Sequence, residues 1–261
     1  MDDLLVELLA GLSVGASMGL LGAGGAIFTV PVFGAVLGHA PKDAFLEALA
    51  VTGAIAAASA VSAALRGSVD LRRAAIFAGA GIVGSQAAAP LAVRMDPRVQ
   101  VSMFALVAGF AAWRMWGSGD PSPAGSSRSG AGTGRPSWAS LGLGAAIGAL
   151  TSILGVGGGF LLIPAFVVRE RLPMAVAVGT SLAVIAVNSA AGLVGQWWSG
   201  GFAGSGFDAT SVAVTAGFGL VGSVAGARIA HRLPQRGVRR AFAVLLALVG
   251  GWMAIRAFGA Y

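Results

Sequence analysis

The chain carries the run Gly22-Ala23-Gly24-Gly25-Ala26 with Pro31 behind it, and the pattern returns as Gly155-Val156-Gly157-Gly158-Gly159 with Pro164 behind it. The two copies lie 133 positions apart, and the match continues without a gap across 11–31 and 144–164, where eight of 21 positions are identical. Glycine inside a helix costs roughly 1 kcal/mol relative to alanine, and a proline one to two turns later removes a further backbone hydrogen bond. Each run therefore predicts a helix that stops and restarts.

The composition is that of a membrane protein. Hydrophobic residues make up 56% of the 261 residues and charged residues 10%, whereas soluble domains carry roughly 25% charged residues. Several segments exceed the ~18 apolar residues of a membrane span, and they lack the period-two alternation of a membrane barrel. We therefore expect an all-α polytopic membrane protein embedded in a lipid bilayer.

The hydrophobic segments form two homologous halves of four segments each. Between them, at 117–137, 15 of 21 residues are glycine, serine or proline, a composition that cannot bury enough apolar surface to order itself. The expected organisation is a first repeat at 1–116, this flexible linker, and a second repeat at 138–261. Matched positions such as Gly84 and Gly222 extend the duplication beyond the glycine runs. The predicted segments are 4–37, 44–65, 71–93, 99–116, 138–168, 174–198, 208–230 and 238–258.

The first, broken segment of each half either crosses the membrane or dips into it and returns as a re-entrant loop. As one helix the first block would be ~51 Å long, too long for a single ~30 Å hydrocarbon core. With all eight segments crossing, the side of the N-terminus carries seven of the 17 basic residues; with both broken segments re-entrant, it carries four. Because basic residues mark the cytoplasmic face, we favour the re-entrant arrangement. Each half then has three spans, the halves are inverted repeats, and both termini are periplasmic in a bacterial inner membrane.

The glycine runs are the predicted substrate site. A half-helix that begins at Gly24 or Gly157 presents unpaired backbone N–H groups and the positive end of a helix dipole, which together favour an anion. In the segment 174–198, polar side chains share one helix face, and Asn188 is costly in an apolar span unless it is paired. The predicted substrate-binding residues are Gly22, Gly24, Gly25, Gly155, Gly157, Gly158, Gly159, Thr180, Ser181 and Asn188.

Other interpretations of such residues stay open. Serine and threonine carry little weight as site residues, because their hydroxyls also bond back to helix carbonyls. Glu47 is either a proton-coupling residue or an interfacial charge. Glycines at four-residue spacing let membrane helices pack closely. We assign to packing the glycines Gly11, Gly15, Gly19, Gly144 and Gly148.

Several kinds of chemistry are not expected. The chain has no cysteine, and its two histidines, His39 and His231, lie near predicted helix ends far from any second ligand, so neither a disulfide nor a metal site is predicted. No Gly-Lys-Ser/Thr follows either glycine run, which excludes a nucleotide-binding loop. A net charge of +7 would suit nucleic acid in a soluble protein, but here we assign it to membrane orientation. We expect no cofactor, no nucleic-acid partner and no enzymatic activity.

The two runs resemble the signatures of a known family. Gly-Leu-Leu-Gly-Ala-Gly-Gly-Ala at 19–26 and Ser-Ile-Leu-Gly-Val-Gly-Gly-Gly at 152–159 are similar to the two signature runs of the TauE/SafE sulfite exporter family. Gly179-Thr180-Ser181-Leu182 resembles the segment that follows the second signature. The resemblance spans essentially the whole chain, and the first copy departs from it at Ala26. It implies transport, above all export, of small sulfur-containing anions such as sulfite or organosulfonates across the bacterial inner membrane.

Two functions remain open on this basis. The first is a secondary transporter that exports a small sulfur-containing oxyanion, driven by the membrane potential or an ion gradient because no ATP-binding motif is present. The second is a proton-coupled uptake permease for another small organic acid or sulfur compound. The sequence leaves the oligomeric state open.

Overall fold

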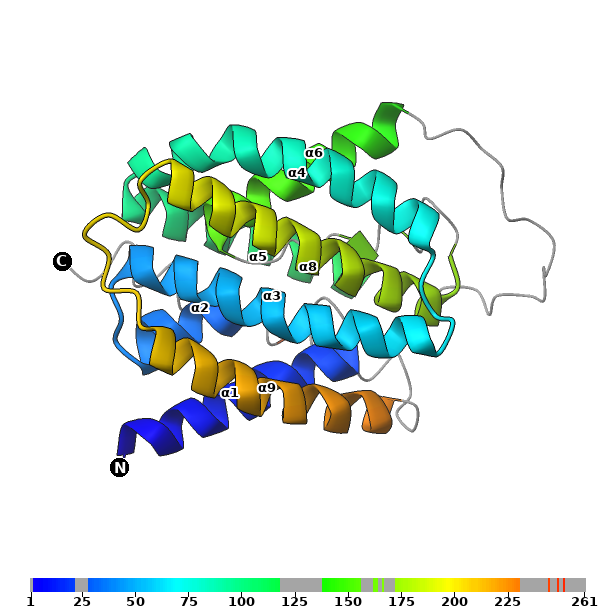
Figure 1. Ribbon diagram of the computed structural model, residues 1–261, viewed down its shortest axis with the longest axis horizontal. Helices are drawn as coiled ribbons and strands as arrows, with labels where there is room; N and C mark the ends of the chain where they lie inside the picture. The colour runs from blue at the N-terminus through cyan, green and yellow to red at the C-terminus, as the bar shows by residue number, and fades with distance from the viewer. Residues whose placement is uncertain are drawn as a thin grey trace.

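The structure, a computed structural model, describes residues 2–21, 28–117, 138–155, 162–163, 166, 172–230, 244, 248 and 251. Every element within these residues is helical, and the helices lie roughly along the long axis of the molecule (Figure 1). The all-helical prediction is thus confirmed for the part of the chain described. The elements are α1 (Asp2–Leu21), α2 (Thr29–Pro31), the π-helix η2 (Val32–Val36), α3 (Pro41–Leu65), α4 (Leu71–Arg94), α5 (Pro97–Gly117), α6 (Trp138–Leu154), α8 (Met174–Trp198) and α9 (Ala209–Ala230).

Among the residues that the structure describes, four helices are long and apolar enough to cross a membrane, namely α3, α4, α8 and α9. The 25 residues of α3 extend about 37 Å at 1.5 Å per residue, more than the ~30 Å of a hydrocarbon core. Large apolar side chains point outward along these helices, such as Val61 (61% exposed) and Val221 (61%). Such a surface suits lipid, so the prediction of a membrane protein is confirmed by length and composition.

The turn between α3 and α4 follows from its local sequence. Gly67 has φ +68°, a left-handed conformation that suits glycine at the end of a helix. Asp70 then caps α4, because its Oδ1 accepts a hydrogen bond from the Arg73 N–H at 2.9 Å and its Oδ2 pairs with the Arg73 guanidinium at 2.5 Å. Burial acts to raise the pKa of Asp70, but the hydrogen bonds and charge of Arg73 outweigh burial and hold the pKa below its ordinary value.

The helices run in two directions, which defines two ends of the molecule (Figure 1). α1, α3 and α9 begin at one end, called the near end, where the Asp208 N–H donates to Glu47 Oε1 at 2.9 Å. α4, α6 and α8 begin at the opposite, far end, where the Asp70 N–H donates to Thr180 Oγ1 at 3.0 Å. α3 and α8 therefore pack against each other in opposite directions.

Glycines allow two helix pairs to approach closely: α1 lies along α9, and α6 lies along α4. A Cβ on Gly15 would lie 1.9 Å from the carbonyl oxygen of Gly219, and a Cβ on Gly148 would lie 2.0 Å from that of Gly81. No side chain fits at these crossings, so the assignment of this glycine pattern to packing is confirmed. Gly11 and Gly19 are also close to α9, with an added Cβ 2.5 Å from the Thr215 carbonyl oxygen and 2.1 Å from that of Ser223. Gly144 is less tightly packed, with an added Cβ 3.0 Å from the Phe77 carbonyl oxygen.

In the first half, the segment after α1 leads back toward the near end. Gly19, close to the end of α1, lies against the last third of α9 and therefore toward the far end. Thr29 lies beside the middle of α3, with its Oγ1 3.2 Å from Thr52 Oγ1. His39 lies at the near end, with its Nδ1 2.5 Å from a carboxylate oxygen of Glu47. The chain thus returns to the end at which α1 began.

The second half shows the same course in the opposite direction. α6 begins at the far end, and Gly155, just after its last residue, packs against the backbone of Phe45 at the near end. Phe166 lies back toward the far end, where its ring meets that of Phe77 with centroids 4.8 Å apart. Both rings are buried in a core that α3, α4 and α8 share. Because lipid is as apolar as these side chains, close packing rather than the hydrophobic effect holds them together.

Candidate substrate site

The ten predicted site residues fall into two groups. Four are described, and all four are buried: Gly155, Thr180, Ser181 and Asn188. They do not form one cluster, because Gly155 lies at the near end, Thr180 at the far end, and Asn188 between them along α8. The other six lie outside the described residues: Gly22, Gly24, Gly25, Gly157, Gly158 and Gly159.

Gly155 opens the second glycine run in a position that requires glycine. Its φ is +63°, its N–H donates to the Thr151 carbonyl at 3.1 Å, and a Cβ would lie 2.5 Å from the carbonyl oxygen of Phe45. A left-handed residue of this kind is a common way to end a helix. Gly155 therefore ends α6 while the chain passes directly against α3.

Asn188 is the most exceptional polar residue in the described bundle. Its side chain is fully buried, and neither Nδ2 nor Oδ1 has a hydrogen-bond partner among the described residues. The amide lies against Gly81 of α4, where a Cβ would come within 2.2 Å of Oδ1. A buried polar group without a partner costs roughly 1–3 kcal/mol. The amide therefore has hydrogen-bonding capacity that no described residue meets and that a ligand or water would satisfy.

Two neighbours along α8 differ in how their hydroxyls are used. Ser181 lies two turns before Asn188 on the same face of the helix, and its buried Oγ has no partner in the described part of the chain. Thr180 instead accepts the Asp70 N–H, which ties α8 to the start of α4. Ser181 thus has a hydroxyl free to bind a ligand, whereas Thr180 has one acceptor already engaged in holding two helices together.

The structure adds two serines that the sequence did not single out. Ser189, next to Asn188, and Ser152, in the last turn of α6, are buried, and their hydroxyl oxygens have no partner among the residues that the structure describes. Ser189 packs against Gly53 of α3, where an added Cβ would lie 3.0 Å from the Ser189 Cβ. The sequence does not distinguish Ser152 and Ser189 from other serines in membrane helices. Such serines often donate to a carbonyl of their own helix, as Ser85 does.

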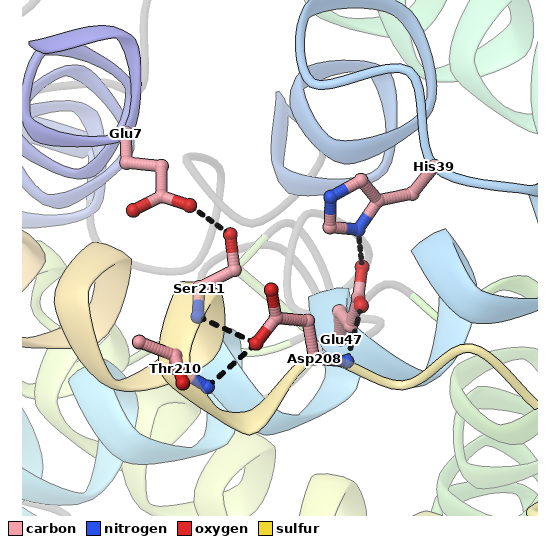
Figure 2. A network of polar contacts seen from close by, with 6 residues as sticks. All are labelled: Glu7, His39, Glu47, Asp208, Thr210 and Ser211. Atoms are coloured by element: carbon pink, nitrogen blue, oxygen red, sulfur yellow. Dashed lines mark hydrogen bonds and ion pairs between the residues drawn. The ribbon is translucent and has the colours of Figure 1, made fainter. Parts of the chain in front are cut away.

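A second polar cluster lies at the near end, where Figure 2 shows Glu47 between His39 and Asp208. The Glu47 side chain has no solvent exposure; His39 Nδ1 lies 2.5 Å from its Oε2, and the Asp208 N–H donates to its Oε1 at 2.9 Å. Asp208 in turn caps α9 through the Thr210 and Ser211 N–H groups, and Ser211 also bonds to Glu7. Glu47 thus connects α3, the segment that returns after α1, and the start of α9.

The contacts at the two ends occur at matching positions of the two halves. Glu47 and Thr180 lie 133 positions apart, and Asp70 and Asp208 lie 138 apart, the offsets at which the halves align. Glu47 accepts the N–H of Asp208, and Thr180 accepts the N–H of Asp70. Each half thus caps the other's helix with the equivalent side chain.

The sequence is similar to those of proteins named as probable membrane transporters. The sequence model of a family described as "Sulfite exporter TauE/SafE" matches residues 7–253. Two curated relatives, both called "Probable membrane transporter protein", come from Xylella fastidiosa strains 9a5c and Temecula1 / ATCC 700964. Each is 28% identical to this chain over 185 residues, which is 70% of this chain and 70% of the relative. No solved structure matches the chain.

Proposed function

Because the chain belongs to the sulfite exporter TauE/SafE family, we propose that this multi-pass membrane transporter exports a small sulfur-containing oxyanion, sulfite or an organosulfonate, across the bacterial inner membrane. The single observation that carries the proposal is the Asn188 amide, which is fully buried inside the bundle without a partner among the described residues. An amide Nδ2 offers two donors to an oxyanion. Two more buried hydroxyls without a partner among the described residues lie on the same helix, Ser189 next to Asn188 and Ser181 two turns earlier.

Neutral donors suit a transported anion better than a buried cation would. Hydrogen bonds to a charged donor are roughly twice as strong as those between neutral groups, and a charged donor therefore holds an oxyanion more firmly. A transporter must release its substrate on the other side in every cycle. Asn188 with its serine neighbours is consistent with selective but reversible binding.

We further propose that the halves are inverted repeats with re-entrant first segments. The matching helices α3 and α8 run antiparallel, so that the axis relating them lies across the helices and hence in the membrane plane. The exchanged contacts of Glu47 and Thr180 support the same axis. The return of the chain from Gly19 to His39 supports re-entry, because the segment leads back to the end where α1 began.

The charges favour a cytoplasmic far end. Exposed arginines there include Arg66 just after α3, Arg72 in the first turn of α4 and Arg228 in the last turn of α9. Basic residues concentrate on the cytoplasmic side, which leaves the near end periplasmic. A singly charged anion that moves outward across an inside-negative potential gains about 2.3 kcal/mol per 100 mV. Export of this kind needs no second substrate.

The test is transport by the purified full-length chain in liposomes. Asn188→Leu replaces the amide with an apolar group of similar size, and we expect sulfite efflux to fall at least about tenfold because the substrate loses its donors. Val187→Leu, a neighbouring change at a partly exposed position, is the matched control and should transport normally. Wild-type efflux rates for sulfite, sulfate, thiosulfate and taurine-like sulfonates then rank the substrates. Normal efflux by Asn188→Leu would refute the site.

One observation favours the alternative, a proton-coupled uptake permease for another small organic acid or sulfur compound. Glu47 is paired with His39 in a site without solvent exposure on the carboxylate, an arrangement that can pass or hold a proton. In that case inward transport should rise with an inward proton gradient, and Glu47→Gln should remove the dependence on the gradient. If the protein is an exporter without proton coupling, wild type and Glu47→Gln should respond to the proton gradient in the same way.

A further inference from the structure

Two junctions of three helices in this molecule have the same build. In one junction α4 packs against both α6 and α8, and in the other α9 packs against both α1 and α3. A glycine of the shared helix meets its neighbours in each junction, Gly81 of α4 or Gly219 of α9. These two glycines lie 138 positions apart, an offset at which the halves of the sequence align. The two junctions can therefore be compared residue by residue.

On one side, the shared glycine is in close contact with a second glycine. A Cβ on Gly148 of α6 would lie 2.0 Å from the Gly81 carbonyl oxygen, and a Cβ on Gly15 of α1 would lie 1.9 Å from the Gly219 carbonyl oxygen. Gly15 and Gly148 also lie at matching positions, 133 apart. Because the backbones already touch on this side, neither Gly81 nor Gly219 can move further toward it.

On the other side, the shared glycine receives the tip of a side chain. A Cβ on Gly219 would meet Ile55 of α3, with Cδ1 at 2.3 Å, and a Cβ on Gly81 would meet Asn188 of α8, with Oδ1 at 2.2 Å. Ile55 and Asn188 lie 133 positions apart, and both are fully buried. The same geometry thus holds an alkyl group in one junction and an amide in the other.

The distances at Gly81 also give the direction in which the Asn188 amide points. An added Cβ would lie 2.5 Å from Nδ2 and 2.7 Å from Cγ, so that Oδ1 and Nδ2 are both closer to it than Cγ is. The amide therefore points end-on at the α4 backbone. Ordinary contact between non-bonded atoms needs roughly 3.5 Å. A methyl group on Gly81 would therefore displace the amide by about 1 Å, since the α4 backbone cannot move away.

We infer that Gly81 is a positioning residue, which holds the Asn188 amide in the place and orientation that bind the substrate oxyanion. The inference rests on the proposed function, because it concerns the same amide. Hydrogen bonds weaken steeply as they bend, and binding groups need to be held within about 0.5 Å of their productive geometry. A methyl group on Gly219 causes a similar overlap, but it displaces only the alkyl tip of Ile55.

The test measures sulfite efflux from liposomes by the full-length chain, with KM separated from the maximal rate per folded transporter. Gly81→Ala should raise KM about tenfold, because the displaced amide no longer donates well to the substrate. Gly219→Ala is the matched control and should keep the wild-type KM, although it introduces a similar overlap. A purely structural role would lower the stability of both variants and leave KM unchanged. An unchanged KM in Gly81→Ala, or an equal rise in Gly219→Ala, would overturn the inference.

A second comparison asks whether Gly81 acts through Asn188. In an Asn188→Ala background, Gly81→Ala should leave KM unchanged, because its methyl group enters the space that the amide has left. A further tenfold rise in that background would show that Gly81 acts by another route and would overturn the positioning role.

Asn188→Gln takes the place of Gly81→Ala if the alanine variant does not fold. It keeps the amide but adds one methylene, so the amide can no longer occupy its position end-on against Gly81. Its KM should also rise about tenfold, and a wild-type KM would contradict the positioning role.

The proposed function fails separately from this inference. If the wild-type chain exports sulfite and Gly81→Ala does so with the same KM, the positioning role is wrong and export stands. If the wild-type chain moves no sulfur oxyanion, export is wrong, and thermal unfolding tests the contact between Gly81 and the amide. Gly81→Ala should then lower the Tm of the wild type but not that of Asn188→Ala, and an equal drop in both would overturn the contact as well.

Discussion

Asn188 and Glu47 are both polar residues within apolar helices, but they differ in their hydrogen-bond partners. Asn188 has no partner among the described residues, whereas Glu47 is held by His39 and the Asp208 backbone. The sequence indicated that Asn188 needs a partner, because an amide is costly in a membrane span. It left Glu47 open between an interfacial charge and a proton-coupling residue, because its partners come from 8 and 161 positions away. The buried, paired carboxylate that the structure shows could not be predicted from neighbouring residues.

The Asp70 cap allows a prediction at the same scale. Asp70→Ala removes the cap of α4 and its pair with Arg73, and we expect a loss of about 1–2 kcal/mol in the free energy of unfolding. Asp70→Asn keeps a capping oxygen and should lose only about half as much. Denaturant titration of both variants in the same detergent measures the difference. A larger loss for Asn than for Ala would contradict the capping role.

The pH dependence of that stability follows from the lowered pKa of Asp70. Because the folded carboxyl binds its proton less readily than the unfolded one, its contribution is complete above the unfolded pKa, roughly pH 3.9. It is lost as the pH falls through the lower folded pKa. The stability gap between wild type and Asp70→Asn should therefore be constant near neutral pH and shrink under acid. A gap that grows under acid would contradict this account.

At the scale of helices, glycine position matters more than glycine content. The four-residue spacing predicted the glycines that α1 and α6 bring to their crossings with α9 and α4, because close approach needs a repeat along one helix face. The Gly155 position against Phe45 depends on a helix over a hundred residues away. No local pattern could have distinguished it from an ordinary helix end.

Two glycines of α6 provide a matched pair for a test. Gly148→Ala places a Cβ 2.0 Å from the Gly81 carbonyl oxygen and should destabilise the protein by about 1–3 kcal/mol through forced helix separation. Gly142 has no atom within 4 Å of its Cβ position, so Gly142→Ala should be neutral or stabilise by up to about 1 kcal/mol. Thermal unfolding of the two variants in one detergent gives the comparison. Equal stability of Gly148→Ala and Gly142→Ala would contradict the close crossing of α4 and α6.

On the scale of the whole molecule, the sequence predicts a duplication because the glycine runs and the prolines behind them recur at one spacing. The sequence does not predict which helices pair, since any apolar face can meet another in lipid. Gln100 and Gln196 escaped notice for a similar reason: each lies near a segment end, where a polar side chain ordinarily meets solvent. Their hydrogen bonds to the carbonyls of Ile153 and Ser152, at the end of α6, emerge only once the separate segments are assembled.

The proposed topology makes a prediction for the entire chain. Reporters fused at the N-terminus and after Lys42 should lie on the same, periplasmic side, because the first segment enters and leaves through one face. A reporter after Arg66 should lie in the cytoplasm, since α3 crosses between the two positions. Alkaline phosphatase and green fluorescent protein fusions in cells report the sides. An N-terminus opposite to Lys42 would exclude re-entry.

The pairing of α1 with α9 also has a consequence for biosynthesis. The glycine surface of α1 emerges from the ribosome long before the helix that covers it, which starts at Ala209. At 5–20 residues per second, α1 waits roughly 10–40 s for that partner. Until then its close-packing surface stands open to lipid and to other nascent chains. Co-expressed fragments cut between Gly117 and Trp138 should therefore rescue each other, whereas either fragment alone should be degraded.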